Sequence, residues 1–526
     1  MEGQLEAILE WAKLNGAIID DNIYFKYEEG SGIGAYTKDN PSATTSTNSI
    51  FIPNNLILTP ETVQKELPII IDDKLILIKI YLAYWKAGNL THSFFNPYLN
   101  LLPSFEMISS PLVTGTDLYL NSPIATAVPL KLKSLNEEYL KFGKDLNLNF
   151  SFEDYLWGHL IVTSRAFPLN IINKDSNEWE VMLLPLIDLL NHKPKADVEW
   201  KNINDGFKIV TKSTDLNNFE LFNNYGPKGN EELLMAYGFT IPNNQFDIVQ
   251  FTLSPTDKIK KIVENLIGDK LPTLNDYMVT KESNNKEKIV FIANEYHPIP
   301  DGMLELFSCQ LLQGGYLFDK PILPTTIKAI ETIRELIKFP IEGLKKIPKE
   351  TNSKNDWQNS KNYREGQLNV YNLLKSSLKN KEKDLLKKYK NSMIKMGKVI
   401  GEWWDYFESD FESDDFFVIV KWLWLVVNGV VDNSINEWFT KLFKKLKELN
   451  VINRNYNEEQ EQVQEQNILS TIYTETFTKL KRDGKIKDEQ SGYWSMDDLW
   501  CVKYIAELTL WDRGEKGFVL IEPLNV

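Results

Sequence analysis

The stretch from Leu183 to His192 reads L-L-P-L-I-D-L-L-N-H. It is an apolar run that ends in the hydrogen-bonding side chains of Asp188, Asn191 and His192. Such side chains need partners when they are buried. We therefore expect these three residues to lie where a strand or short helix leaves the core.

A second stretch, from Asn223 to Phe239, reads N-N-Y-G-P-K-G-N-E-E-L-L-M-A-Y-G-F. It places Tyr225 and Tyr237 each before a glycine, around a loop and a short apolar segment. Both phenol groups could therefore converge on one pocket. Neither stretch contains a nucleophile or a metal cluster.

The two stretches, in this order, resemble the split C-terminal signature of SET-domain methyltransferases. The resemblance is to the group of the plant Rubisco large-subunit lysine methyltransferase, which carries D-x-x-N-H and later Y-G-x-x-x-N-x-E-L-x-x-x-Y-G-F. Upstream counterparts cover roughly the first half of the chain: S-R-A-F-P at Ser164–Pro168, F-N-P-Y-L-N-L-L-P at Phe95–Pro103, S-G-I-G-A-Y at Ser31–Tyr36 and I-F-I-P at Ile50–Pro53.

Within this group the chain is most similar to fungal members that methylate lysines of a large-subunit ribosomal protein. Two stretches carry this likeness: A-I-L-E-W-A-K-L-N-G-A-I-I from Ala7 and N-N-Y-G-P-K-G-N-E-E-L-L from Asn223. The resemblance implies an α+β fold, in which a SET-type β fold of short strands with a helical insertion precedes a mostly α-helical C-terminal domain. It places the catalytic domain at residues 1–250, the insertion at about 60–180 and a substrate-binding domain at residues 251–526.

Hydrophobic periodicity gives a consistent secondary structure. Alternating patterns predict short strands at Ile23–Tyr27, Gly34–Thr37 and Ile50–Ile52. Helical spacing predicts an N-terminal amphipathic helix that stops at Asn15-Gly16, helices at Leu75–Ala87 and Phe152–Arg165, and a buried helix in the apolar stretch Phe416–Val431. The segment from Lys349 to Gly366 is polar and rich in asparagine, which indicates a loop or linker.

Three charged segments follow in the C-terminal half. Lysines are in excess from Gln367 to Lys398, whereas Glu402–Asp415 and Glu458–Glu465 are acidic. Such segments are usually solvated helix faces or loops. Acidic residues interleaved with Trp403, Trp404 and neighbouring rings could also hold a basic partner.

The resemblance assigns the cofactor, S-adenosylmethionine, to a set of residues around the two stretches. Asn191 and His192 would hold it through side-chain and backbone hydrogen bonds, and Arg165 would neighbour its carboxylate. The remaining assigned residues are Ser31, Gly32, Ile33 and Gly34 through their backbone, Asp188 as a positioning residue, and Tyr237. The group often places Glu-x-Leu against the cofactor, but this chain has S-T-N-S-I there, which leaves the role of Thr47 or Asn48 open.

Methyl transfer to an amine is a direct displacement that requires alignment, exclusion of water and a neutral lysine. Tyr237 is the candidate that orients the lone pair of the amine, and Tyr225 completes the channel. Taken alone, His192 and Tyr237 would be structural residues, and Arg165 could equally pair with a nearby carboxylate. His92, His159 and His297 are interpreted as structural, and the four histidines are too scattered for a metal site.

The segment E-E-G-S-G-I-G at Glu28–Gly34 also fits the glycine loop of Rossmann-like methyltransferases. That loop needs a buried strand before it and a helix directly after it. Here the preceding N-I-Y-F-K-Y alternates, and the following A-Y-T-K-D-N-P-S-A-T-T-S-T favours turns. The glycines therefore fit a hairpin better than a Rossmann loop.

Composition restricts the possible functions. The chain has 526 residues, 73 acidic against 59 basic, and a net charge of -14, which argues against direct nucleic-acid binding and suits a basic protein substrate. Its two cysteines, Cys309 and Cys501, indicate neither a disulfide framework nor a zinc cluster. Neither a signal peptide nor a membrane span is expected. We predict a location in the cytoplasm, with the nucleus as a second location, and we also predict a monomer.

These observations predict an S-adenosylmethionine-dependent protein-lysine N-methyltransferase that acts on a large-subunit ribosomal protein, without a metal. Two alternatives remain open at this point. One keeps the fold but methylates an elongation factor, cytochrome c or a histidine. The other is a non-catalytic module that binds peptides in a SET-type groove.

Overall fold

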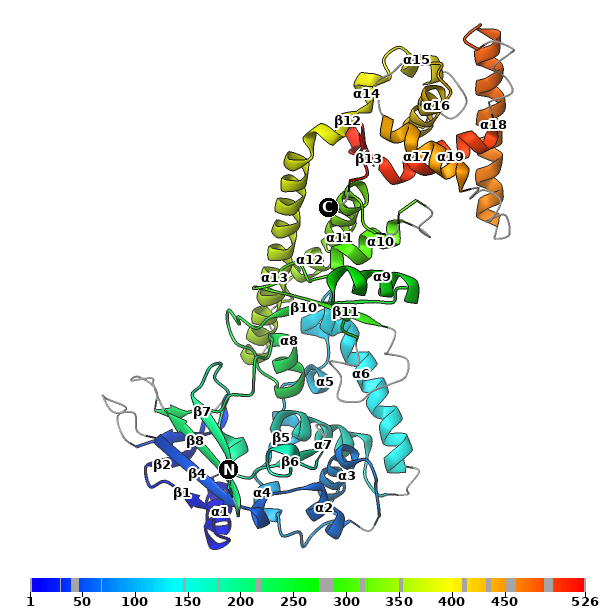
Figure 1. Ribbon diagram of the computed structural model, residues 1–526. Helices are drawn as coiled ribbons and strands as arrows, with labels where there is room; N and C mark the ends of the chain where they lie inside the picture. Colours follow the sequence, from blue (N-terminus) through cyan, green and yellow to red (C-terminus); the bar gives the residue numbers. More distant parts are fainter. Residues whose placement is uncertain are drawn as a thin grey trace. The chain divides into compact units, whose positions relative to one another are not determined.

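The computed structural model describes most of the chain (Figure 1). The chain divides into two compact units. The first unit comprises Met1–Val249, Asn294–Tyr296 and Phe339–Tyr371, and the second comprises Gln250–Ala293, His297–Lys338 and Asn372–Val526. The described residues are 2–28, 30–38, 47–67, 69–144, 148–176, 180–203, 205–212, 219–273, 288–312, 317–318, 320–349, 353–408, 414–431, 437–449, 460–486 and 495–524.

The strands of the first unit form small antiparallel sheets. They are β1 (Ile18–Ile19), β2 (Ile23–Glu28), β3 (Gly32–Thr37), β4 (Thr47–Pro53), β5 (Ala166–Pro168), β6 (Val181–Leu183), β7 (Val198–Ile203), β8 (Gly206–Lys212) and β9 (Glu220–Leu221). The sheet orders are β1-β4-β8-β7, β2-β3-β9 and β5-β6. β9 pairs with β3 so that Glu220 lies opposite Tyr36, which brings the second sequence stretch next to the β2–β3 hairpin.

Helices fill the chain between β4 and β6. They are η1 (Asn54–Leu56), α2 (Pro60–Glu66), α3 (Lys74–Lys86), α4 (Asn96–Leu99), η2 (Phe105–Met107), α5 (Pro111–Thr114), η3 (Asp117–Tyr119), α6 (Pro123–Tyr139), the π-helix η4 (Leu140–Lys144), α7 (Phe152–Arg165) and η5 (Leu169–Ile171). α7 begins where Ser151 and Asp154 form a reciprocal capping box. α1 (Glu2–Leu14), α3, α7 and the strands other than β7 contribute to one hydrophobic core.

The remaining elements of the first unit surround the two sequence stretches. They are η6 (Ile187–Leu189), α8 (Asn230–Glu232), the π-helix η7 (Leu233–Tyr237), most of α12 (Lys338–Leu344) and the first part of α13 (Lys354–Lys388). The structure thus corrects the predicted loop at 349–366, because residues 354–366 are helical.

That prediction was wrong because polar residues of α13 are buried instead of solvated. Ser360, Asn362 and Gln367 are buried, and Arg364 is 1% exposed. The Arg364 guanidinium donates to the carbonyl oxygens of Leu118 at 3.1 Å and Leu120 at 2.7 Å, and to those of Gly343 and Leu344. A helix that packs by hydrogen bonds to loops lacks the apolar stripe that periodicity detects.

The second unit is mostly helical. Its helices are α9 (Asp257–Ile267), α10 (Met303–Leu311), α11 (Leu323–Leu336), the second part of α13, η10 (Lys390–Ser392), α14 (Met396–Val399), α15 (Trp403–Glu408), α16 (Asp415–Val427), α17 (Glu437–Glu448), α18 (Gln460–Arg482), α19 (Met496–Thr509) and η13 (Gly514–Lys516). The strands β12 (Met393–Lys395), β14 (Phe518–Ile521) and β13 (Leu510–Asp512) form a sheet in that order, and β10 (Ile248–Leu253) pairs with β11 (Ile289–Asn294).

The other periodicity predictions are confirmed. The predicted strands lie within β2, β3 and β4, and the predicted N-terminal, Leu75–Ala87 and Phe152–Arg165 helices match α1, α3 and α7 closely. The helix predicted at Phe416–Val431 is present as α16, which ends at Val427, four residues earlier than predicted. The acidic segment at 402–415 lies partly outside the described residues, and so does the one at 458–465. None of the helices in the described part of the chain combines the length and the apolar character that crossing a bilayer requires.

Replacing Arg364 with Met tests the polar packing of α13. The substitution leaves several buried carbonyl groups without a donor, so we expect the free energy of unfolding of the first unit to fall by about 3 kcal/mol. Urea unfolding of the full chain measures this change. Lys361→Met on the same helix is the matched control, because the ion pair of Lys361 with Glu365 spans 4.0 Å between partly exposed side chains. Equal losses in both variants would refute the expectation.

Candidate functional site

The first sequence stretch makes a sharp turn at the end of β6. Leu186 has a φ of 71°, a left-handed conformation that is costly for a residue with a branched side chain. It leads directly into η6, where Ile187, Asp188 and Leu189 are all buried. The turn aims Asp188 into the unit and lets Asn191 and His192 emerge at its half-buried edge.

Asp188 is held from two elements of the helical region. Its Oδ2 accepts from the hydroxyl of Tyr98 in α4 at 2.8 Å and from Nη1 of Arg165 at the end of α7 at 3.3 Å. Arg165 also donates to the backbone oxygen of Asp188 at 3.0 Å. The alternative interpretation of Arg165, a pair with a nearby carboxylate, is therefore present in the structure.

Burial and pairing act in opposite directions on this cluster. Burial raises the pKa of Asp188, although Arg165 and the Tyr98 hydroxyl favour its charged form. Burial has the largest single effect on Arg165 and would lower its pKa, but the Asp188 carboxylate, Tyr98 and Tyr225 together raise that pKa. Arg165 therefore stays a cation, and its charge is balanced within the protein.

Three rings stack behind this cluster and bring the two sequence stretches together. His192 and Tyr225 have centroids 4.8 Å apart with an interplanar angle of 16°. Tyr225 and Tyr237 have centroids 5.0 Å apart at 21°. Phe239 closes the group edge-on, 6.1 Å from Tyr237. The rings of Tyr225 and Tyr237 thus lie against each other, whereas their convergence on one pocket stays a prediction.

Hydrogen bonds fix the first two rings of the stack. The Tyr225 hydroxyl donates to the carbonyl of Leu190 at 2.8 Å, and the Tyr225 backbone N–H donates to Nδ1 of His192 at 3.1 Å. Because Nδ1 accepts, the proton of neutral His192 is on Nε2. Burial lowers the pKa of His192 to about 4, so the ring is neutral at pH 7.

The hydroxyl of Tyr237 differs in its hydrogen bonding from the polar groups of Tyr225 and His192. Within the described part of the chain, no hydrogen-bond partner of that hydroxyl is found, and the side chain is only partly buried. Burial raises the pKa of Tyr237 above the usual value, so the phenol keeps its proton at neutral pH. It can therefore donate or accept a hydrogen bond toward a bound group.

Glu220 connects the hairpin to Asn191. The Asn191 amide donates to Oε1 of Glu220 at 2.8 Å. A Cβ at Gly34 would lie 2.8 Å from the same oxygen, so only glycine leaves room for this carboxylate against β3. Gly34 is one of the residues predicted to contact the cofactor through their backbone. The Glu220 side chain lies between it and Asn191 and connects the two. Ser31 instead lies beside a hollow formed with Ser353–Asn355 at the start of α13.

The structure shows how far Thr47 and Asn48 are buried, but it does not assign either of them a role in cofactor binding. Thr47 is exposed on β4, whereas Asn48 is 2% exposed and its Nδ2 has no partner among the described residues. Asp188 Oδ1 and His192 Nε2 are likewise buried without a partner in the described part of the chain. Orphaned buried polar atoms of this kind mark places where a bound polar group fits.

The turn after Tyr237 is held from two sides. Gly238 has a φ of 78°, and a Cβ there would lie 3.1 Å from the backbone of Ser109. On the other side, Asn359 of α13 donates to the carbonyl of Gly238 at 3.2 Å and accepts from the Thr240 backbone N–H at 3.1 Å. The partly buried Asn359 side chain of α13 thus fixes the backbone that follows Tyr237.

Asn230 of the second stretch has a structural role. Asn230 donates from its backbone and its side chain to Asp247 at 2.6 and 3.1 Å, and its Oδ1 accepts from the Ile241 backbone at 2.8 Å. Burial raises the pKa of Asp247 to about 6. This network closes the loop between η7 and β10.

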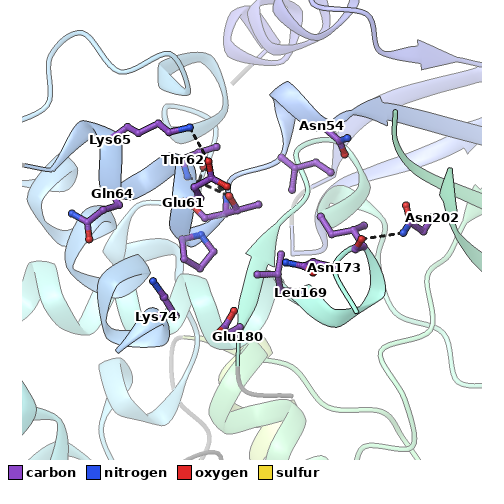
Figure 2. A pocket seen from close by; sticks show the side chains of 14 residues that line it. Asn54, Glu61, Thr62, Gln64, Lys65, Lys74, Leu169, Asn173, Glu180 and Asn202 are labelled. Carbon is purple, nitrogen blue, oxygen red and sulfur yellow. Dashed lines mark hydrogen bonds and ion pairs between the residues drawn. The ribbon is translucent and has the colours of Figure 1, made fainter. Parts of the chain in front are cut away.

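A larger hollow of the first unit lies elsewhere. It has a volume of about 910 Å³ beside α2, η5 and β6, and its wall is largely polar (Figure 2). Lys65 at its edge pairs with Glu61, and Asn202 donates to the carbonyl of Ile172. None of the site residues predicted from the sequence lines it.

The residues around Asn191 fit S-adenosylmethionine. That cofactor is a sulfonium with an ammonium and a carboxylate, and the site offers the Glu220 and Asp188 carboxylates, the Arg165 cation and the orphaned His192 N–H. Among the described residues, no three His, Cys, Asp or Glu side chains converge so as to hold a metal ion.

Comparison with known proteins finds relatives that are methyltransferases. No family model matches the chain. The ribosomal lysine N-methyltransferase 1 of Saccharomyces cerevisiae is 26% identical over 472 residues, 75% of this chain and 79% of that protein. The ribosomal lysine N-methyltransferase set10 of Schizosaccharomyces pombe is 34% identical over 269 residues, 48% of each chain. The human actin-histidine N-methyltransferase is 27% identical over 279 residues, 48% of this chain and 45% of that protein.

Solved structures give the same fold. The SET domain of the Rubisco large-subunit methyltransferase, bound to lysine and S-adenosylhomocysteine, superposes with a TM-score of 0.57 at 16% identity, over 79% of this chain and 98% of that one. The chain has the fold of this SET domain and is similar in sequence to methyltransferases of this group. The predictions of the family, of the α+β fold class and of S-adenosylmethionine as cofactor are confirmed.

The roles of individual residues in this SET domain stay predictions, but their placement is clear. The structure brings Asp188, Asn191, His192, Tyr225 and Tyr237 together with Arg165, and it connects Gly34 to them. It shows no such link for Ser31, Gly32 or Ile33 within the described residues. Sequence reasoning missed Glu220 and Asn359, for which no motif existed. It also gave no role to Tyr98, although Tyr98 lies in the quoted F-N-P-Y-L-N-L-L-P.

Glu220→Ala tests the link between the hairpin and Asn191. Loss of the acceptor frees the Asn191 amide, so we expect the affinity for S-adenosylhomocysteine to fall about tenfold. Glu220→Gln keeps an acceptor oxygen and should retain most of the affinity. Isothermal titration calorimetry compares the variants, and equal affinities of Glu220→Ala and the wild type would contradict this role.

Asn359→Ala tests the support of Tyr237. Because the turn loses three hydrogen bonds, we expect kcat to fall about tenfold through misplacement of the phenol, with the affinity for S-adenosylhomocysteine unchanged. Asn369→Ala, an exposed asparagine of the same helix, is the control. A variant that loses cofactor affinity and kcat in parallel would show a general loss of structure instead.

Proposed function

We propose that this SET-domain protein transfers a methyl group from S-adenosylmethionine to the ε-amino group of a lysine in a large-subunit ribosomal protein. The observation that carries the proposal is the stack of His192, Tyr225 and Tyr237, which ends in a phenol without a partner in the described part of the chain. The names of the two yeast relatives, ribosomal lysine N-methyltransferases, support the acceptor and the substrate class.

The residues of the site match what this reaction requires. When bound, S-adenosylmethionine supplies an electrophilic methyl group on a sulfonium. A lysine with a reference pKa of roughly 10.4 must lose its proton before it can attack, and apolar and aromatic walls favour the neutral amine by desolvation. Tyr237 can orient the lone pair of that amine, while Tyr225, fixed by the Leu190 carbonyl, forms the adjacent wall.

Charge supports a basic protein as the substrate. The chain has a net charge of -14, and an acidic surface attracts a basic partner over a distance of about a Debye length. We extend the proposal to a monomer that binds neither nucleic acid nor membrane for this task and works in the cytoplasm, with the nucleus as a second location.

A histidine acceptor is the second candidate, because actin-histidine N-methyltransferases are also among the relatives. A neutral imidazole needs no deprotonation before it attacks. Lysine is favoured by the ring stack, since a phenol beside aromatic walls suits a small amine. Chemical analysis of the methylated product separates the two acceptors.

The decisive experiment measures transfer of radiolabelled methyl from S-adenosylmethionine into purified ribosomal proteins. We expect one large-subunit band labelled on lysine. Label on another protein of a lysate would support methyl transfer but reject a ribosomal protein as the substrate. Label on histidine would support methyl transfer but reject lysine as the acceptor. Cofactor binding without transfer to any protein would support a non-catalytic binding module.

Tyr237→Phe and Asn191→Ala separate chemistry from cofactor binding. We expect Tyr237→Phe to lower kcat at least about tenfold, since the orienting hydroxyl is lost, with little change in cofactor affinity. Asn191→Ala should mainly lower the affinity for the cofactor. Tyr296→Phe is the control, because Tyr296 is 67% exposed. Full activity of Tyr237→Phe would remove the phenol from the reaction.

A further inference from the structure

The second unit contains a pocket of about 500 Å³ with an apolar floor. Its lining residues come from the end of α13, from α14 and from the strands β12, β13 and β14 or the turns beside them. Figure 1 labels α13, α14, β12 and β13 in this part of the chain. Leu386, Met393, Val399 and Val519 line this floor. A volume of this size accommodates one or two large side chains of a partner.

Strand register shows which row of side chains faces the pocket. Lys395, Val519 and Trp511 are paired across the three strands and form one row. The neighbouring row contains Leu520 and Leu510, which belong to the hydrophobic core of the unit. Because side chains alternate between the two faces of a strand, the row of Lys395 faces the pocket.

Four cationic groups surround the apolar floor. Lys390, Lys395 and Lys398 are exposed, and the Arg513 guanidinium lies 4.7 Å from the centroid of the Trp511 ring. No Asp or Glu lines the pocket among the described residues. This concentration of positive charge contrasts with the net charge of -14 of the whole chain. Three of the four cations, Lys390, Lys395 and Lys398, belong to the lysine-rich segment Gln367–Lys398, which contributes nothing to the catalytic site.

We propose that this pocket is a docking site for an acidic segment of a protein partner, in which one large apolar side chain is flanked by carboxylates. The apolar side chain would fill the floor, and the carboxylates would pair with Lys390, Lys395, Lys398 and Arg513. The site goes beyond the proposed function, since it requires no methyl transfer and recognises the charge opposite to that of a basic substrate.

The same cations could in principle attract RNA phosphates, but the floor argues against RNA. Single-stranded RNA binds by stacking its bases on exposed aromatic faces. Trp511 is the aromatic residue of the lining, and it is 4% exposed and covered by Arg513. An aliphatic floor with a cationic rim instead matches an apolar side chain between acids.

Fluorescence anisotropy with the full-length protein tests the site. The probe is a fluorescein-labelled peptide of sequence Gly-Asp-Glu-Phe-Glu-Asp-Gly, compared with one that has Ala in place of Phe, one that has Lys in place of the acids, and a labelled oligouridylate. We expect the acidic Phe peptide to bind most tightly and its affinity to fall with added salt. The double variant Lys395→Glu/Lys398→Glu should weaken it about tenfold or more.

The matched control is Lys381→Glu/Lys388→Glu, which makes the same change of net charge at exposed positions of α13 outside the pocket. It should change the affinity less than about threefold. The proposal would be overturned if both double variants weakened binding equally, or if the Ala or Lys peptide bound as tightly as the acidic Phe peptide. It would also be overturned if the oligouridylate bound more tightly than the peptide and Lys395→Glu/Lys398→Glu abolished that binding. Unchanged methyl transfer in the Lys395→Glu/Lys398→Glu variant would show that the catalytic unit is intact.

Discussion

The site depends on one buried carboxylate. Asp188 accepts from Tyr98 in α4 and from Arg165 at the end of α7, so two helices of the first unit fix the turn that presents Asn191 and His192. A buried charge is costly unless it is paired and hydrogen-bonded. Here the pairing holds Leu186 in a strained backbone conformation and sets the direction in which the chain leaves η6. The positions of Asn191 and His192 depend on the direction in which the chain leaves η6.

The second support of the site is a helix with an unusual interior face. α13 contributes Asn359 to the turn that follows Tyr237 and Arg364 to the loops around η3 and α12. Packing through polar groups is directional, whereas apolar packing tolerates small shifts. A turn that carries a reactive phenol benefits from directional contacts, because an error of about 1 Å in placement is costly in rate.

Charge is distributed unevenly over the chain. The whole protein is acidic, its site keeps His192 neutral and Tyr237 protonated, and a pocket of the second unit is surrounded by cations. A neutral, aromatic site suits the loss of a proton from an amine. The acidic surface and the basic pocket suit two different partner segments. Net charge alone therefore describes the encounter with a substrate but not the local recognition.

The sequence by itself determined the family, the strands β2, β3 and β4, the helices α3 and α7, and the approach of Tyr225 to Tyr237. These features follow from local periodicity and from contiguous motifs, which a single chain displays directly. The tertiary structure decided the partners: Tyr98 for Asp188, Glu220 for Asn191 and Asn359 for the turn after Tyr237. These pairs join residues 90, 29 and 121 positions apart. Distance along the chain hides such contacts. The helical state of residues 354–366 was hidden for a related reason, because its polar side chains indicate solvent until their buried partners are known.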